Sequence, residues 1–218
     1  MNEDIFPYLN ELASKDILND YELEYMEKYS KNDDYEIRMN VAEILVISKT
    51  KKSKKILIDL TNDKNYLVRA NACESLSIFN DKETLMLLIN IMKRDKSRIV
   101  RAYAILSARD IALSLDSEAK CFVVEFLKHL VRNKTCRMIL VAAYSGLYLL
   151  CDNKYINNIF DELNSKRYQL RCFTVNILLD ITDSSNKDII LKRLRNLYKT
   201  EKTTAVKSTL TYAIERLR

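Results

Sequence analysis

Residues 63–79, DKNYLVRANACESLSIF, return with the same pattern at residues 95–111, DKSRIVRAYAILSARDI. An aspartate opens each stretch, an arginine preceded by valine follows six positions later, and small or apolar residues follow the arginine at three and seven positions. A basic residue in this setting recurs at steps of 31, 32, 36, 34 and 36 residues: Arg38, Arg69, Arg101, Arg137, Arg171 and Lys207. Self-similarity at a period of about 20 to 50 residues is the signature of a repeat protein.

One helical stripe is common to the six units. It consists of the positions one residue before and three, seven and ten residues after each basic residue, and its members are mostly apolar or small. Short polar clusters such as 31–34 and 183–186 separate the helices, and loops this short make neighbouring helices antiparallel. The sequence therefore predicts an all-α protein, an α-solenoid (superhelix) of about six helical hairpins. Its helices are expected at 3–13, 20–31, 34–48, 51–61, 65–79, 82–94, 97–114, 117–133, 135–151, 154–164, 167–182, 186–199 and 202–217.

The composition excludes several classes of site. With one Gly in 218 residues, neither a P-loop, nor a dinucleotide-binding fingerprint, nor a hydrolase nucleophile elbow can be present. The five Cys are odd in number, contain no C-x-x-C pair and lie in apolar surroundings, which favours buried thiols in a reducing compartment. His129 is the only histidine. We expect no metal and no cofactor.

The chain is expected to form one domain in the cytoplasm. The longest apolar stretch, about 14 residues at 138–151, is shorter than the roughly 20 residues that a membrane span needs, so it indicates a central buried helix. The acidic start, Met1 to Asp4, is unlike the basic start of a signal peptide. The domain is predicted to cover 1–218, with an acidic N-terminal cap and first helices at 1–31 and repeats at 32–218.

The Asp-to-Arg spacing resembles that of HEAT repeats, especially the short HEAT-like repeats first noted in phycobilin lyases. The resemblance covers about residues 20–218 and implies an armadillo-like superhelix. In that family the two residues link successive repeats in a polar ladder, and the matching positions here are Asp63, Arg69, Asp95, Arg101, Arg137 and Arg171. Asn32, Ser165 and Glu201 stand where the family has aspartate, and the fourth repeat has no clear counterpart. The ladder is therefore expected to be complete only in the middle of the N-terminal half.

The second helix of each hairpin is expected to supply the binding surface, because second helices line the concave face of such solenoids. Opposite the core stripe, the predicted concave-face residues are Asn40, Glu43, Asn71, Glu74, Tyr103, Asp110, Ile139, Phe173, Asn176 and Asp180. Tyr103, Ile139 and Phe173 would form an apolar strip of the kind that anchors protein partners. The alternative is that curvature or helix phase buries these three. Gly146 lies within a predicted helix, which indicates close backbone packing or ligand approach.

Charge is unevenly distributed along the chain. Residues 1–50 carry a net charge of −7 and residues 51–218 one of +13. Basic residues gather at predicted helix ends, and the same enrichment continues at 192–195. A basic edge of this kind is able to follow a phosphate backbone. The candidate phosphate contacts are Lys93, Arg94, Lys96, Arg98, Arg132, Lys134, Lys166 and Arg167. The alternative is that they are solvated surface charges. A protein is thus the first expected partner and nucleic acid the second, with no membrane.

Three functions compete. The first is a non-enzymatic scaffold or adaptor, for example a bacterial adaptor, that acts by protein–protein interaction through its concave face. It rests on the repeat, the mixed polar and apolar groove, and the absence of a recognisable catalytic constellation. The third is a helper of a pigment- or cofactor-attaching lyase, which only the name of the repeat subclass suggests.

The second function is an enzyme on DNA. The chain is similar in length and repeat style to the HEAT-like alkylpurine DNA glycosylases, which use a concave, basic groove with a carboxylate and aromatic residues facing the lesion. Asp110 with Tyr103, or Asp180 with Phe173, would supply a carboxylate and a ring on one helix face, and Asp110 is the candidate catalytic residue. The sequence contains no Trp, the aromatic residue typical of that lesion site, and the predicted groove is not mainly basic. We therefore expect the protein not to be an enzyme.

Overall fold

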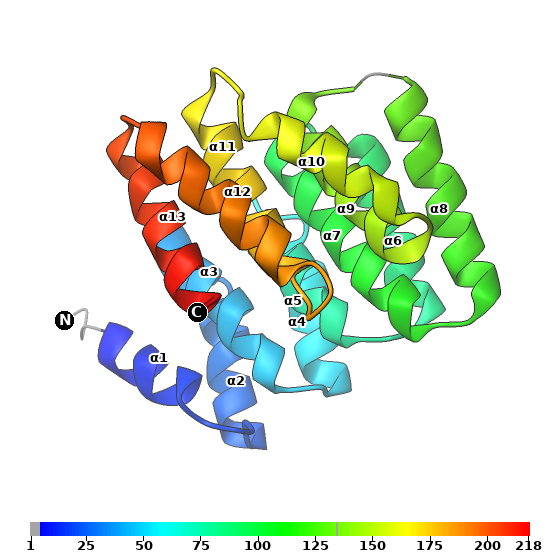
Figure 1. The fold of residues 1–218 in the computed structure, drawn as a ribbon. Coiled ribbons are helices and arrows are strands. Elements are labelled where there is room, and N and C mark those ends of the chain that lie inside the picture. Colours follow the sequence, from blue (N-terminus) through cyan, green and yellow to red (C-terminus); the bar gives the residue numbers. More distant parts are fainter. Residues whose placement is uncertain (1–4, 134) are drawn as a thin grey trace. The chain divides into compact units, whose positions relative to one another are not determined.

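The computed structural model describes residues 5–133 and 135–218, and within these ranges it contains thirteen α-helices and no strand (Figure 1). The all-α prediction is confirmed. Two compact units make up the chain, unit 1 at Met1–Lys120 and unit 2 at Cys121–Arg218. That the chain forms a single domain stays a prediction.

Unit 1 contains the first seven helices: α1 (Phe6–Ala13), α2 (Asp20–Tyr29), α3 (Tyr35–Ile44), α4 (Lys51–Leu60), α5 (Tyr66–Ser75), α6 (Lys82–Arg94) and α7 (Arg98–Ser114). Short 3-10 helices, Leu45–Ile47 and Leu76–Ile78, continue α3 and α5. The second helices of successive hairpins pack side by side, because α5 contacts both α3 and α7. This row of helices carries the face that the sequence predicts for binding.

Unit 2 contains the remaining helices, except that α8 begins in unit 1: α8 (Ser117–Arg132), α9 (Arg137–Leu150), α10 (Ile156–Glu162), α11 (Tyr168–Asp180), α12 (Lys187–Thr200) and α13 (Thr204–Arg216). A 3-10 helix, Asn153–Tyr155, precedes α10. Within this unit α11 packs against α9 and α13, and α12 packs against α13. The observed bounds lie within a few residues of the predicted ones, and residues 3 and 4 of the first predicted helix lie outside the described residues.

Polar side chains cap the N-termini of several helices. Asn19 and Glu22 form a capping box at α2, and Thr50 and Ser53 form one at α4. An aspartate, Asp81, accepts a hydrogen bond from the third backbone N–H of α6. Each such cap stabilises its helix by about 1 kcal/mol, which explains how a chain with one glycine can make so many turns.

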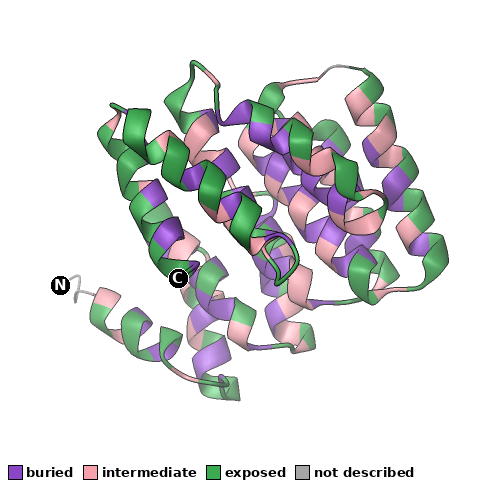
Figure 2. Cartoon of the chain, in the orientation of Figure 1, coloured by how far each residue is buried: buried purple, intermediate pink, exposed green. Residues whose placement is uncertain are grey.

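The core follows the predicted stripe in five of the six units. In those units every stripe position is buried, for example Val68, Ala72 and Leu76, each 0% exposed. Figure 2 shows the result on α12 and α13, where the outward sides are exposed and the buried residues lie toward neighbouring helices. The second helices of these five units therefore bury the same face.

Helix α9 is the exception, and it corrects one prediction. Its stripe residues Cys136, Leu140 and Tyr144 are only half-buried, whereas Ile139, expected on the binding face, is 1% exposed. After Arg137 the helix contains no charged residue, so it has no polar side to face water. Ile139 is part of the core and offers nothing to a partner.

No helix in the described part of the chain is both long and apolar enough to cross a membrane.

Candidate functional site

A ladder of arginine–carboxylate pairs joins successive hairpins of unit 1. Arg38 of α3 donates through Nε and Nη2 to the carboxylate of Asp63 at 2.6 and 2.9 Å. Arg69 of α5 repeats this geometry with Asp95 at 2.8 and 3.0 Å. The Nη1 of each arginine donates to two backbone carbonyls of the loop before its own helix. Each buried guanidinium thus ties its own loop to the aspartate of the following repeat.

The two aspartates of the ladder, Asp63 and Asp95, have a structural role. Burial disfavours their charged form, yet the arginine and a backbone N–H together hold the pKa of Asp63 and of Asp95 below the ordinary value. The N–H groups are those of Asn65 and Ser97, both 2.7 Å from a carboxylate oxygen. A carboxylate with this many donors is not available to a ligand.

The ladder departs from the expectation in the third and later repeats. Arg101 donates from Nε to a backbone carbonyl, that of Met92, at 2.7 Å, and has no acidic partner among residues 5–133 and 135–218. In unit 2 the acid is a glutamate, because Arg137 pairs with Glu162 at 2.9 Å and Arg171 pairs with Glu201. The ladder therefore extends beyond the N-terminal half, and the prediction that it would stop there is wrong.

Glu201 accepts more hydrogen bonds than the other acids of the ladder. Arg171 donates to its two carboxylate oxygens at 2.7 and 2.9 Å, and the backbone N–H groups of Lys202 and Thr203 donate to one of them. These donors lower the pKa of Glu201 to about 2. Sequence reasoning placed Glu201 at the aspartate position but missed Arg38 and Glu162. Arg38 is the first of the six recurring basic residues, so the sequence already contained the signal for it. Glu162 lies at the end of α10, three residues before the repeat position where an acid is expected.

Three second helices of unit 1 contribute polar side chains to one surface, which we call the unit 1 face: Asn40 and Glu43 of α3, Asn71 and Glu74 of α5, and Tyr103 of α7. Asn71 Nδ2 donates to Glu43 Oε1 at 2.6 Å, which links α5 to α3. Burial raises the pKa of Tyr103, and the carboxylates of Glu74 and Glu43 raise it further. The two glutamates are exposed and the other three side chains are half-buried. The expected residues therefore lie near one another here.

Asp110, the candidate catalytic carboxylate, is already engaged. Arg109 donates from Nε to Asp110 Oδ1 at 2.7 Å, and its Nη2 lies 2.7 Å from the same oxygen. The arginine side chain is 3% exposed and the aspartate side chain is 42% exposed. Within the described ranges no group of three or more His, Cys, Asp or Glu side chains is arranged to hold a metal ion.

In unit 2 the predicted binding residues differ in how far their side chains are buried. Phe173 is half-buried, while Asn176 and Asp180 are exposed, all three on α11. With Ile139 in the core, the expected apolar strip of Tyr103, Ile139 and Phe173 does not form.

The candidate phosphate contacts are exposed wherever the structure describes them. Four of them lie around the α6–α7 loop of unit 1: Lys93, Arg94, Lys96 and Arg98. Lys96 and Arg98, together with Lys64 and Tyr66, line a cavity of about 710 Å³. Three more lie in unit 2, Arg132, Lys166 and Arg167, whereas Lys134 lies outside the described residues.

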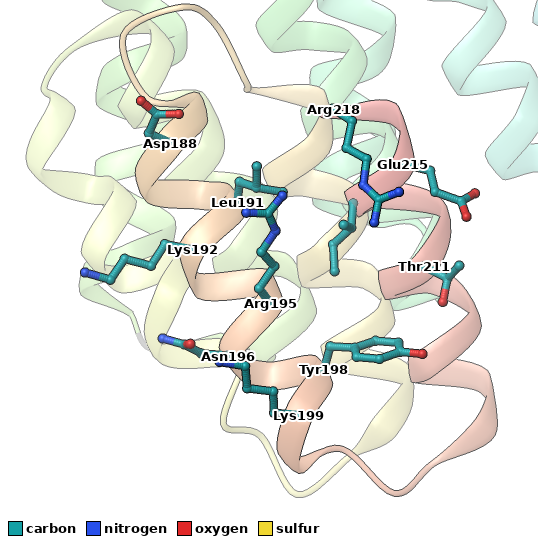
Figure 3. Close-up of a pocket in the computed structure, with 11 residues that line it drawn as sticks. Asp188, Leu191, Lys192, Arg195, Asn196, Tyr198, Lys199, Thr211, Glu215 and Arg218 are labelled. Atoms are coloured by element: carbon teal, nitrogen blue, oxygen red, sulfur yellow. The ribbon is translucent and has the colours of Figure 1, made fainter.

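A second cavity, of about 570 Å³, lies between α12 and α13 in unit 2 (Figure 3). Its basic lining residues are Lys192, Arg195, Lys199 and Arg218. The sequence shows the basic run at 192–195. The lining residues of the cavity come from two helices, however, and only the packing of these helices brings them together.

The fold can now be compared with known proteins. Residues 23–109 match the family model of HEAT repeats. This part of the chain consists of HEAT repeats. The Arg38–Asp63 and Arg69–Asp95 links described above lie inside the matched HEAT region. No curated protein matches the chain.

Two solved structures resemble this chain over most of its length. One is in the complex of CpcE and CpcF of phycocyanin lyase from Nostoc sp. PCC7120, with a TM-score of 0.59, 15% identity, and coverage of 97% of this chain and 86% of that chain. The other is YibA of Escherichia coli, with a TM-score of 0.55, 16% identity, and coverage of 100% and 78%. At this identity the likeness shows the fold alone.

Proposed function

We propose that the chain is a non-enzymatic scaffold that holds a protein partner on the unit 1 face. The HEAT-repeat solenoid supports this role, because stacked hairpins present an extended surface built from successive second helices. The observation that carries the proposal is the Asn71–Glu43 link, at 2.6 Å, beside Glu74 and Tyr103. Three successive repeats thereby contribute to one polar surface, while the ladder arginines Arg38 and Arg69 are satisfied elsewhere.

The chemistry of the unit 1 face fits a protein segment that carries Lys or Arg. Two exposed carboxylates, Glu43 and Glu74, attract cations and set the orientation of an approaching segment. Asn40 Nδ2 already donates to the carbonyl of Glu36 and Asn71 Nδ2 to Glu43, which leaves each amide one N–H and its oxygen to pair with the C=O and N–H of an extended backbone. The Tyr103 ring adds apolar area with a polar tip, a combination enriched at interfaces.

We do not extend the proposal to catalysis by Asp110. Its carboxylate is occupied by Arg109, and a general base or lesion-facing acid has to be free to meet its substrate. Purified protein is accordingly expected to release no base from methylated DNA under conditions in which a control glycosylase does.

The test is an affinity pull-down from an extract of the native host, with and without nuclease. The variant is E43Q/E74Q, and its matched control is E24Q/D59N, which removes two exposed carboxylates from α2 and α4 of the same unit. We expect a stoichiometric protein that survives nuclease, is retained by the control and is lost by the E43Q/E74Q variant. Equal retention by both variants, with unchanged melting temperatures, would refute the assignment of the binding face.

A further inference from the structure

The last two helices carry the net charge of the whole chain. Residues 187–218 contain nine Lys or Arg and three Asp or Glu, a net charge of +6, and the entire chain also has a net charge of +6. One of the three acids, Glu201, is neutralised by Arg171, which lies outside the segment. The surface of α12 and α13 is therefore strongly basic.

This charge surrounds a cavity. The 570 Å³ space between α12 and α13 has apolar Leu191 and Ile214 among its lining residues, with Thr211 on the α13 side. Figure 3 shows Arg195 extending along α12 beside Leu191, and Arg218 extending from the segment after α13. The lining thus combines apolar residues with two guanidinium groups, one from α12 and one from the segment after α13, and guanidinium groups bind phosphates well.

The cations of this cavity have no acidic partner in the part of the chain that the structure describes. Among the described residues, Lys192, Arg195, Lys199 and Arg218 make no ion pair and no side-chain hydrogen bond. The contrast is with Lys54 of unit 1, whose ammonium group lies 2.9 Å from both Asp81 and Glu83.

Two carboxylates, Asp188 and Glu215, are also among the lining residues, which leaves the lining with more cations than acids. Figure 3 shows Glu215 directed away from the cavity, Lys192 directed away from it on the other side, and Asp188 near the start of α12. A set of uncompensated positive charges around one concave space favours an anionic ligand.

Two exposed aromatic rings lie on the same two helices, Tyr198 among the residues that line the cavity and Tyr212 outside its lining. Tyr198 of α12 is 42% exposed and Tyr212 of α13 is 54% exposed. Lys207 Nζ lies 5.8 Å from the centroid of the Tyr198 ring, and Arg216 lies 5.8 Å from that of Tyr212. Rings beside cations are the combination that binds single-stranded nucleic acids, because the bases stack on the rings while Lys and Arg contact the phosphates.

We propose that the surface of α12 and α13 around this cavity, the α12–α13 face, binds single-stranded nucleic acid, with Arg195, Lys199 and Arg218 on the phosphates and Tyr198 and Tyr212 against the bases. An acidic protein segment would satisfy the cations but has no planar bases for the rings. The proposal does not depend on the unit 1 face, which lies in the other unit and carries the opposite charge.

The test uses a fluorescein-labelled dT12 oligonucleotide and fluorescence anisotropy between 50 and 200 mM salt. The variant is R195E/K199E, and the control is K49E/K55E, which makes the same change of net charge at exposed lysines of unit 1. We expect wild type and control to bind alike, and R195E/K199E to bind at least about tenfold more weakly. The slope of log K against log salt becomes shallower by about 1.4, because two phosphate contacts are lost.

A second variant separates stacking from charge. Y198A/Y212A retains every charge, and each lost ring is expected to weaken dT12 binding about fivefold or more. Circular dichroism confirms that each variant is folded. Absence of dT12 binding at 50 mM salt, equal losses in R195E/K199E and K49E/K55E, or equal competition by polyglutamate or anionic vesicles would each overturn the proposal. The E43Q/E74Q variant should retain full dT12 affinity, so failure of one proposal leaves the other measurable.

Discussion

Removing a ladder arginine is expected to destabilise the solenoid far more than removing its unpaired equivalent. In R69A the side chain of Asp95, 11% exposed, loses its two arginine donors at 2.8 and 3.0 Å and keeps the N–H of Ser97, and two backbone carbonyls lose their arginine donor. Breaking a buried ion pair from one side costs about 3 to 5 kcal/mol. At the same position of the next repeat, Arg101 makes one hydrogen bond to a backbone carbonyl, so R101A is expected to cost about 1 kcal/mol.

Urea unfolding followed by far-UV circular dichroism measures this difference. With a slope of about 2 to 3 kcal/mol per M, the midpoint of R69A should fall by about 1 to 2.5 M and that of R101A by about 0.5 M or less. Because repeat proteins unfold in parts, hydrogen exchange of peptides from 63–79 and 95–111 provides a local readout.

A double-mutant cycle with D95N isolates the pair itself. The coupling energy between Arg69 and Asp95 is expected to be about 1 to 3 kcal/mol. A loss below about 1 kcal/mol in R69A, or equal losses in R69A and R101A, would refute the reasoning that the arginine–aspartate links hold successive repeats together.

Three further predictions concern single residues. The pKa of Glu201 is lowered from 4.5 to about 2 by hydrogen bonds, first of all from its arginine partner, so its contribution to stability is present above about pH 4.5 and lost as the pH falls toward 2. Melting temperatures measured from pH 7 to 2 should fall less steeply in E201Q than in wild type, and parallel curves would contradict this assignment. I139A should lower the free energy of unfolding by about 2 to 5 kcal/mol, because the side chain is 1% exposed. A loss below about 1 kcal/mol would contradict the placement of Ile139 in the core. With a thiol reagent, Cys121 and Cys151 should react in the native protein and Cys73 only after unfolding, since the first two are exposed and burial raises the pKa of the Cys73 thiol; labelling of native Cys73 would show that its surroundings are open.

Much of the fold was predictable because the repeats are amphipathic. A charged or amide residue on one side of α3, α5, α11 and α13 fixes the phase of each helix, so the core stripe could be assigned without a structure. The same reasoning failed at α9, where no charge follows Arg137 and the face opposite the stripe is buried as well. The long apolar run at 138–151 already indicated a central helix, and this signal outweighs a phase taken from the repeat alignment.

The candidate sites were predictable only in part, for a geometric reason. The unit 1 face follows from repeat offsets, since Glu43 and Glu74 occupy equivalent positions of successive second helices. The ladder partners were harder, because Arg137 pairs with Glu162, an acid displaced by three residues from the repeat position. The α12–α13 cavity requires knowing how two helices pack, and a sequence shows only that both are basic.

Site-specific photo-crosslinking tests the scaffold function most directly. A photoreactive amino acid at position 74, on the unit 1 face, is compared with one at position 59, which is exposed on α4. Our account predicts a covalent adduct with a host protein from position 74 that persists after nuclease treatment, and none from position 59. Equal adducts from both positions, or none from position 74 in an extract where the partner is retained by pull-down, would contradict binding at the unit 1 face.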